Sequence, residues 1–385
     1  MRICLVYDCL FPYTVGGAER WYRNLALRLR AEGHEVTYVT MRQWPRGEAP
    51  DLPGVRVVSV APRMRLYAGP GHRRIPPPIV FGAGVLAHLL VRGRRYDVVH
   101  TASFPYFSLL AAAAARRLHG FTLVVDWHEL WSRAYWREYL GAAGGWVGWT
   151  VQKLCLRVRQ RAFCFARLTA GRLAAEGVRG EVTVLEGEYA GSLEPVAPAP
   201  ADPVVVFAGR HIPEKRAPAA VAAIAAARRR VPELRGIVFG DGPDRPRVLE
   251  AIERENLLDA VTAPGFVAHE ELDAALARAL CLLHPSRREG YGLVVVESAA
   301  AGVPVVLVAH PDNAATELVE EGVNGFIAPS DDPEALADAI ERVHAAGPAL
   351  RASTADWFAR NAKRLSIDTS LDVVARSYAA RSARS

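Results

Sequence analysis

The sequence predicts two α/β domains, each a parallel sheet covered by helices, that face a central cleft. The chain has 385 residues, which is too long for one ordinary hydrophobic core. Short apolar runs alternate with helical periodicity in both halves, as in parallel sheets covered on both faces. The segment 191–203 is rich in proline and alanine, and this composition is typical of a linker.

Strands are expected at short β-rich runs, and helices where apolar residues recur at helical spacing. In the first half the expected strands are Ile3–Tyr7, Val36–Thr40, Val55–Val60, Val98–Thr101 and Leu123–Asp126, and the expected helices are Ala18–Glu32 and Tyr106–Leu118. In the second half the expected strands are Val204–Ala208, Gly236–Phe239, Val261–Thr262, Cys281–His284 and Pro304–Val308, and the expected helices are Ala217–Arg230 and Pro333–Ala380. These elements predict an N-terminal domain over 1–190, a C-terminal domain over 204–365, and a helical tail over 366–385 that could pack back on the N-terminal domain.

The composition is that of a globular chain, with 51% hydrophobic and 23% charged residues. Five scattered cysteines form no C-x-x-C pair, which argues against a disulfide framework or a zinc site and favours a reducing, cytoplasmic location. The N-terminal apolar run stops at Asp8 and predicts a strand rather than a signal peptide. The longest apolar stretch, Ile79–Val91, contains two glycines and a histidine and is too short to cross a bilayer.

Charge is distributed unevenly along the chain. Residues 1–194 contain 26 basic and 15 acidic residues, a net charge of +11, whereas residues 195–385 contain 21 and 26, a net charge of −5. A basic half favours an anionic partner, which could be a phosphorylated ligand, a membrane surface or a nucleic acid. No recognised nucleic-acid-binding motif accompanies this charge, so we expect no nucleic-acid partner.

A glycine pair, Gly16 and Gly17, follows the first expected strand and opens the first expected helix. Glycine lets the backbone approach a ligand closely, and a helix N-terminus offers free N–H groups to an anion. The alternative is a tight turn that requires glycine only for its shape.

Two cationic residues, Arg210 and Lys215, follow Gly209 after the first expected strand of the second half. A guanidinium fork and an ammonium at this place could neutralise a diphosphate across the cleft. The alternative is a solvated loop. Because the chain has only two other lysines, Lys153 and Lys363, a lysine at this position favours a function.

The strongest pattern is the strand–loop–helix segment from His284 to Glu297. Glu289 is expected in the loop and Glu297 inside the helix, where carboxylates could accept hydrogen bonds from a vicinal diol of a sugar. Gly290 and Gly292 leave the helix N-terminus bare, so that its N–H groups could hold a phosphate. The alternative is that both glutamates are ordinary residues near a helix.

Together these motifs resemble those of the family 4 retaining glycosyltransferases, which have the GT-B architecture of two Rossmann-like domains. The resemblance covers nearly the whole chain. It includes the glycine pair, the Gly209-Arg210 element with Lys215, the Glu-x7-Glu signature that ends at Glu297, and the strand-end segment 126–129, Asp-Trp-His-Glu. Segments 302–305 and 324–326 also resemble the family's downstream sequence.

Three positions depart from the family pattern. Arg216 and Tyr291 stand where the family usually has Gly and Phe, respectively. The segment 312–317, Asp-Asn-Ala-Ala-Thr-Glu, replaces a usual Gly-Gly pair ahead of a glutamate, and this change leaves the shape of that loop open.

The resemblance implies a role for each matching residue. His128 would hydrogen-bond the donor sugar, Arg210 and Lys215 would neutralise the leaving nucleoside diphosphate, Glu289 would contact the sugar hydroxyls, and Glu297 would contact the ribose. The implied catalytic residues are His128, Glu289, Arg210 and Lys215. The implied donor-binding residues are Gly16, Gly17, Gly209, Arg210, Lys215, Phe266, Val267, Glu289, Gly290, Tyr291, Gly292, Leu293 and Glu297.

The implied reaction is transfer of a sugar from a UDP- or GDP-linked donor to an acceptor hydroxyl with retention of configuration. The donor phosphate would take the acceptor's proton, so the protein would act mainly by stabilising phosphate oxygens. Glu289 as a nucleophile is the lower-ranked alternative. The donor is a substrate, so no cofactor is expected. The absence of an Asp-x-Asp motif predicts a reaction without metal.

Other interpretations remain open at this point. A GT-B phosphorylase or a sugar-nucleotide epimerase is the enzymatic alternative, and a basic nucleic-acid-binding protein is the alternative of another class. The acceptor could be a lipid-linked sugar, a polysaccharide or a small-molecule hydroxyl. The tryptophan- and arginine-rich segment 127–165 could be core, or it could give the basic half a peripheral contact with the inner face of a membrane.

Overall fold

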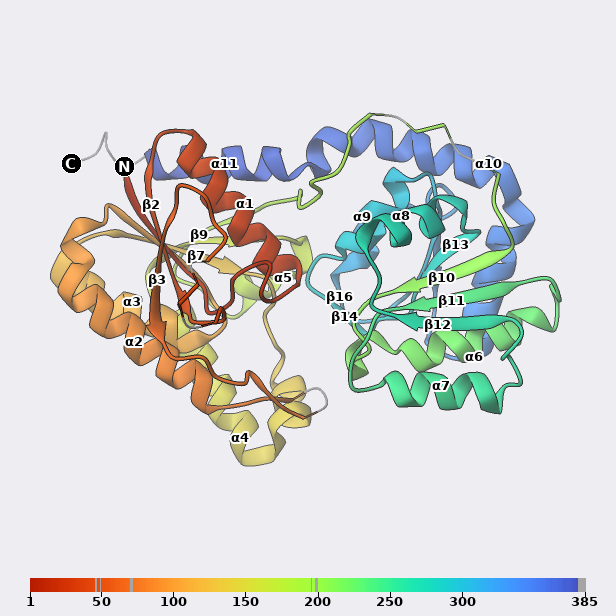
Figure 1. Ribbon diagram of the computed structural model, residues 1–385, viewed down its shortest axis with the longest axis horizontal. Helices are drawn as coiled ribbons and strands as arrows, with labels where there is room; N and C mark the ends of the chain where they lie inside the picture. The colour runs from red at the N-terminus through yellow and green to blue at the C-terminus, as the bar shows by residue number, and fades with distance from the viewer. Residues whose placement is uncertain (46, 49, 70–71, 195, 198–199, 380–385) are drawn as a thin grey trace. The chain divides into compact units, whose positions relative to one another are not determined.

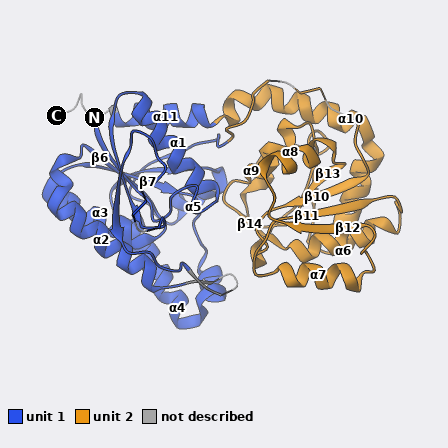
Figure 2. Cartoon of the chain, in the orientation of Figure 1, with its two compact units in different colours: residues 1–68, 72–188, 367–385 blue, residues 69–71, 189–366 orange. Residues whose placement is uncertain are grey.

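The structure is a computed structural model that describes residues 1–379 except 46, 49, 70, 71, 195, 198 and 199. The chain divides into two compact units (Figure 2). Unit 1 contains residues 1–68, 72–188 and the chain from Ile367 on, and unit 2 contains residues 69–71 and 189–366. The expected linker, 191–203, and the expected tail, 366–385, both lie partly outside the described residues. The tail is helical from Ile367 to Ala379, and this helix belongs to unit 1, whereas Ser366 belongs to unit 2.

Unit 1 is built on a seven-stranded parallel sheet in the order β3-β2-β1-β6-β7-β8-β9 (Figure 1). Its strands are β1 (Arg2–Val6), β2 (Glu35–Met41), β3 (Arg56–Ala61), β6 (Val98–Ala102), β7 (Thr122–Trp127), β8 (Gln160–Cys164) and β9 (Gly180–Val184). Its helices are α1 (Gly17–Ala31), α2 (Pro76–Arg92), α3 (Tyr106–His119), α4 (Arg133–Leu156), α5 (Arg167–Ala175) and α11 (Ile367–Ala379). A short 3-10 helix, Gly93–Arg95, follows α2, and the short strands β4 (Tyr67–Gly69) and β5 (His72–Arg73) pair with each other.

Unit 2 is built on a six-stranded parallel sheet in the order β12-β11-β10-β13-β15-β17. Its strands are β10 (Val204–Ala208), β11 (Arg235–Phe239), β12 (Val261–Gly265), β13 (Cys281–His284), β15 (Val305–Val308) and β17 (Gly325–Ala328), and β14 (Arg288–Glu289) pairs with β16 (Asp312–Asn313) beside them. Its helices are α6 (Ala217–Arg228), α7 (Arg245–Arg254), α8 (His269–Arg278), α9 (Leu293–Ala300) and α10 (Pro333–Leu365), with 3-10 helices at Pro213–Lys215 and Ala314–Leu318.

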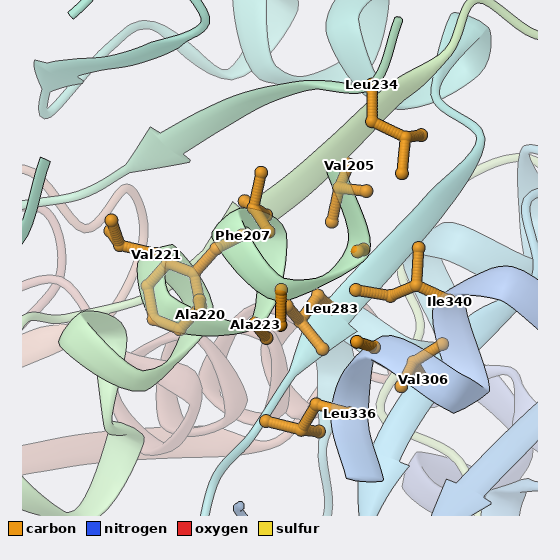
Figure 3. Close-up of a cluster of buried hydrophobic side chains, with 14 of the residues drawn as sticks. Val205, Phe207, Ala220, Val221, Ala223, Leu234, Leu283, Val306, Leu336 and Ile340 are labelled. Atoms are coloured by element: carbon orange, nitrogen blue, oxygen red, sulfur yellow. The ribbon is translucent and has the colours of Figure 1, made fainter. Parts of the chain in front are cut away.

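Each sheet has its own hydrophobic core. In unit 2, Val205, Phe207, Leu283 and Val306 project from central strands against small and branched side chains of α6 and α10 (Figure 3). The alanines of α6 allow this helix to lie close to the sheet. In unit 1, α2 to α5 contribute to the core on one sheet face, while α1 and α11 contact each other. Both sheets are therefore buried by helices, as the uninterrupted apolar runs predict.

The two Rossmann-like parallel sheets confirm the predicted fold class, and the expected strands are confirmed within one or two residues at most ends. No strand was expected at β8, β9 or β17, because these runs are only four or five residues long. The expected helix Pro333–Ala380 is interrupted. Gly347 has a non-helical conformation before Pro348, and Ser366 separates α10 from α11.

Candidate active site

In unit 2, a lysine, a histidine and a glutamate form a buried polar cluster at the carboxyl ends of β10 and β13. Lys215 ends the 3-10 helix that follows β10, His284 ends β13, and Glu289 lies in β14. Lys215 Nζ donates a hydrogen bond to Glu289 Oε1, and His284 Nε2 lies 2.5 Å from the same oxygen. Ser286 Oγ lies 3.1 Å from His284 Nε2. One carboxylate oxygen is therefore shared by a cation and an imidazole.

The cluster favours the charged form of Glu289. Burial alone would raise the pKa of this carboxyl group, but the Lys215 ammonium and His284 outweigh burial and hold the pKa well below its usual range. The side chains of Glu289 and Lys215 are 10% and 19% exposed, so their attraction is only weakly screened by water. The site thus contains an ionised carboxylate held by a lysine side chain.

The sequence analysis assigned Lys215 and Glu289 to different parts of a donor, whereas the structure brings them into direct contact. Arg210 lies on the loop that precedes Lys215, and it is exposed. An incoming phosphate could take over hydrogen bonds from Lys215 only if the Lys215–Glu289 contact loosens. His284 begins the motif that ends at Glu297, but no role was expected for it. Its place directly ahead of Ser286 and Glu289 was the available signal.

Helix α9 begins next to this cluster. Its N-cap is Gly292, which has φ +98° and makes no side-chain cap. A Cβ at Gly292 would lie 2.5 Å from Ala315 Cβ, so both the conformation and the space require glycine. No side chain therefore caps the first N–H groups of α9, and such free N–H groups can bind an anion. Glu297 lies on α9 and is half-buried, which disfavours its interpretation as an ordinary exposed residue.

Two of the three departures from the family pattern have structural explanations. Arg216 has φ +54°, a left-handed conformation that glycine adopts at lower cost, and its guanidinium pairs with Asp331 at 2.5 Å. In the segment 312–317, Asn313 Nδ2 donates to the carbonyls of Ser286 and Val308, and Asn313 Oδ1 accepts from the Ala315 N–H. Asn313 thus braces a loop that the sequence analysis left open, and it fixes that loop to the segment ahead of Glu289.

The loop after β12 presents an aromatic ring to solvent. Phe266 is 76% exposed, and it follows Gly265, whose φ is +94°. Arg245 supports this loop by donating to the carbonyl of Ala263 at 3.0 Å. A large exposed ring beside half-buried Val267 is consistent with an apolar or stacked ligand at this position.

In unit 1, His128 follows β7 directly. Its ring stacks on Phe165, with ring centroids 4.7 Å apart and planes inclined by 3°. Burial lowers its pKa, against the opposing effect of Asp126 and Glu129, and so favours the neutral imidazole. A neutral ring can both donate and accept a hydrogen bond, as contact with a sugar hydroxyl requires.

Asp126, two residues before His128, belongs to a buried chain of polar contacts. Asp126 Oδ2 accepts a hydrogen bond of 2.8 Å from Trp21 Nε1, and Asp126 Oδ1 lies 2.7 Å from His100 Nε2. His100 Nδ1 in turn lies 2.5 Å from the hydroxyl of Tyr378, on α11. The sequence analysis missed His100 and Tyr378, because nothing in the sequence places residue 378 beside residue 100.

The glycine pair of unit 1 starts α1 without a tight turn. Gly16 is the N-cap with φ −174°, an extended conformation that any residue can adopt, and a Cβ at Gly17 would meet no atom within 4 Å. The interpretation as a turn that requires glycine for its shape is therefore wrong. The space is open at Gly17 alone, because a Cβ at Gly16 would lie 2.4 Å from Glu19 Oε2.

The tryptophan-rich segment 127–165 is mostly core. Trp127 and Trp136 are buried, Trp131 and Trp149 pack against the core of unit 1, and only Trp146 is largely exposed, at 56%. The buried Gln152 ties the segment together by accepting a hydrogen bond from Trp136 Nε1 at 3.1 Å. Among the five tryptophans, the core interpretation therefore holds for four.

No helix in the described part of the chain is long and apolar enough to cross a membrane. Within the same part, no group of three or more histidine, cysteine, aspartate or glutamate side chains could hold a metal ion.

Comparisons with known families match the two units in turn. Residues 15–187 match the family described as Glycosyltransferase Family 4, and residues 194–364 match the family described as Glycosyl transferases group 1. Both families consist of enzymes that transfer sugars. The chain belongs to the group 1 glycosyltransferases of the family 4 type.

Two curated relatives illustrate the range of the similarity. The chain is 34% identical to an alpha-D-kanosaminyltransferase of Streptomyces kanamyceticus over 37% of this chain and 36% of that protein, so the match spans about a third of its length. It is 26% identical to a glycogen synthase of Mycobacterium tuberculosis over 89% of this chain and 86% of that protein.

Solved structures support the same fold. Sucrose-phosphate synthase from Thermosynechococcus elongatus matches with a TM-score of 0.82 and 23% identity, covering 100% of both chains. The Anabaena protein HepE, in complex with UDP-glucose, matches with a TM-score of 0.74 and 19% identity, covering 98% of this chain and 99% of that chain. The fold of the chain is therefore GT-B.

Proposed function

We propose that this glycosyltransferase uses a nucleoside-diphosphate sugar as donor and transfers the sugar with retention of configuration. The observation that carries the proposal is the Lys215–Glu289–His284 cluster beside the uncapped N-terminus of α9. A cation and free N–H groups suit a diphosphate, and an ionised carboxylate suits sugar hydroxyls. UDP and GDP are the expected nucleotides, and the UDP-glucose bound by HepE supports UDP.

In the proposed reaction, Arg210 and Lys215 neutralise the diphosphate as the bond to the anomeric carbon breaks. The donor phosphate oxygen accepts the proton of the acceptor hydroxyl, and the hydroxyl oxygen forms the new bond on the same face of the sugar. Glu289 orients the sugar hydroxyls, and His128 contacts the sugar through its neutral ring. The protein then contributes chiefly by stabilising negative charge that develops on phosphate oxygens.

The deciding experiment is a ligand screen followed by a transfer assay. Thermal shift and calorimetry with UDP, GDP, ADP and dTDP would identify the nucleotide, and the matching sugar nucleotides would then be tested with hydroxyl acceptors. Net transfer with a retained anomeric configuration is the expected result. Phosphate-dependent cleavage or an epimerised donor would instead identify a phosphorylase or an epimerase, and an inverted product would overturn the retaining mechanism.

Independence from metal is part of the proposal. We expect full activity in excess EDTA, because the phosphate charge is met by Arg210, Lys215 and the N–H groups of α9. Initial rates with EDTA, with Mg²⁺ and with Mn²⁺ provide the measurement. Loss of activity in EDTA that either metal restores would contradict the prediction.

A further inference from the structure

Helix α2 of unit 1 is apolar on its exposed side as well as on its buried side. From Ile75 to Val91 the chain contains no Asp, Glu, Lys or Arg. Phe81, Val85 and Leu89 are fully buried against the core. A helix that is apolar all round normally lies inside a protein or in a membrane, yet one side of α2 faces solvent.

The exposed side of α2 continues onto α3. Its large apolar side chains are Ile79, Val80, Leu90 and Val91 of α2 with Leu118 of α3, and Val91 and Leu118 are 80% and 64% exposed. The two helices pack against each other in parallel (Figure 1). Their carboxyl ends are held together by His119, which contacts the carbonyl of Leu90 at 3.1 Å. We call these five residues the α2–α3 surface.

The segment of the sequence that contains α2 and α3 is strongly basic. Between residues 52 and 125 the sequence contains ten arginines and one acidic residue, Asp97, which pairs with Arg2 at 2.7 Å. Arg94, Arg95 and Arg117 are exposed next to the carboxyl ends of α2 and α3. Arginine side chains can extend from such a position toward phosphate groups while their aliphatic parts cover apolar surface.

From these observations we propose that the α2–α3 surface docks on an anionic lipid membrane, with α2 lying in the interface. Exposed branched side chains flanked by arginines are the features of an interfacial helix, and α2 is too short to span a bilayer. A second copy of the chain fits less well, because a two-fold interface would bring the arginines of both copies together. This inference does not depend on the proposed transfer reaction.

The proposed surface differs from the segment that the sequence analysis singled out for membrane contact. That segment buries most of its tryptophans, whereas α2 and α3 expose the five apolar residues of the α2–α3 surface. From the sequence, Ile79–Val91 was expected only to be too short to cross a bilayer. A surface helix needs no such length, because it lies along the headgroups with one face inserted.

The test is co-sedimentation of the full chain with vesicles of phosphatidylcholine alone or mixed with phosphatidylglycerol. We expect binding to the mixed vesicles and little binding to phosphatidylcholine, with a marked loss at high salt. Val91→Glu combined with Leu118→Glu should lower the affinity by at least about tenfold. Removing Arg94, Arg95 or Arg117 should lower it roughly fivefold for each arginine.

The matched control is Leu258→Glu, since Leu258 is 74% exposed in unit 2. This variant should bind vesicles like the wild type. Thermal unfolding checks that all variants fold. If the variant with both Val91→Glu and Leu118→Glu does not fold, Val91→Ser replaces it as a milder change. Equal binding to both vesicle types, no binding at low salt, or binding that the α2–α3 substitutions leave unchanged would overturn the proposal. If the chain instead forms dimers that Val91→Glu dissociates, and does not bind vesicles, the α2–α3 surface would be an interface with a second copy.

Discussion

The two units have similar sheets, but a partly buried carboxyl group in each has its pKa shifted in opposite directions. Glu188, just beyond β9 in unit 1, has its pKa raised to about 8 by burial and by the nearby charge of Asp126. Glu289, beyond β13 in unit 2, has its pKa held below the usual range because Lys215 and His284 outweigh burial. The fold supplies burial in both places. The presence of a cation decides whether the carboxyl group is charged.

The two histidine–carboxylate contacts, His100 with Asp126 and His284 with Glu289, differ in their surroundings. His100 and Asp126 are fully buried, and their remaining contacts go to Trp21 and Tyr378, so they join α1, the sheet and α11. The contact of His284 with Glu289 is joined by Lys215, and it lies next to the N-terminus of α9, which no side chain caps. The first contact is suited to stability, and the second is suited to ligand exchange. Substitutions can test this division.

The largest expected effect is on stability, from Asp126→Asn. The amide keeps the shape of the carboxylate but loses the charge that faces His100 and offers an N–H group where an acceptor is needed. Removing one partner of a buried pair costs about 3–5 kcal/mol. Urea unfolding monitored by circular dichroism measures the change. A free energy of unfolding within error of the wild type would show that this cluster is not structural.

The next largest effect is on ligand binding, from Lys215→Ala. Loss of a charge-assisted hydrogen bond costs about 1.5–3 kcal/mol, so nucleoside-diphosphate affinity should fall roughly 10- to 150-fold, and turnover should fall with it. Arg210→Ala should act in the same direction.

Arg229→Ala is the control for Lys215→Ala, because Arg229 pairs with Glu334 on the exposed surface of the same unit. It should leave binding unchanged. Calorimetry with UDP and GDP provides the measurement. Wild-type affinity in both the Lys215 and the Arg210 variants would remove the proposed phosphate site.

A smaller effect should separate the two glutamates. Glu297→Gln should weaken binding of the bare nucleoside diphosphate, because Glu297 is proposed to contact the ribose. Glu289→Gln should leave that binding intact or slightly tighter, since Lys215 loses its internal partner, while turnover of the sugar nucleotide falls. Calorimetry beside initial rates measures both quantities.

Equal weakening of bare nucleotide binding in the two variants would contradict this division of roles. A covalent glycosyl-enzyme, or an azide-rescued product with Glu289→Gln, would restore the double-displacement alternative.

The last prediction concerns Glu188 and pH. Because its pKa is raised in the folded chain from an ordinary value of 4.5, the folded state retains a proton that the unfolded state loses between about pH 4.5 and 8. Stability should therefore decrease as pH rises through this range. Glu188→Gln should flatten the decrease, which thermal unfolding from pH 5 to 8 would show. An unchanged slope in the variant would mean that Glu188 is ionised in the folded chain.

Much of the fold could be predicted because its signals are local. Apolar runs such as Val204–Ala208 determine buried strands, and glycine-bounded loops determine where helices start. Strands β8 and β9 escaped prediction because short segments such as Gln160–Cys164 are recognisable as strands only when neighbours complete the sheet. Helix α11 was predicted as a helix, but its membership of unit 1 depends on contacts across more than 270 residues, such as that of Tyr378 with His100.

By itself, the sequence determined the two sheets, the positions of their loops and the types of residue at their carboxyl ends. Arg210, Lys215, Glu289 and Glu297 could be selected in this way because strand–loop–helix order places them locally. Only the tertiary structure decided which groups share a proton or a charge. The contact of Lys215 with Glu289 joins residues 74 positions apart, and the exposed apolar face of α2 results from what packs on its other side. Pairing and exposure depend on distances between distant segments, which no local pattern encodes.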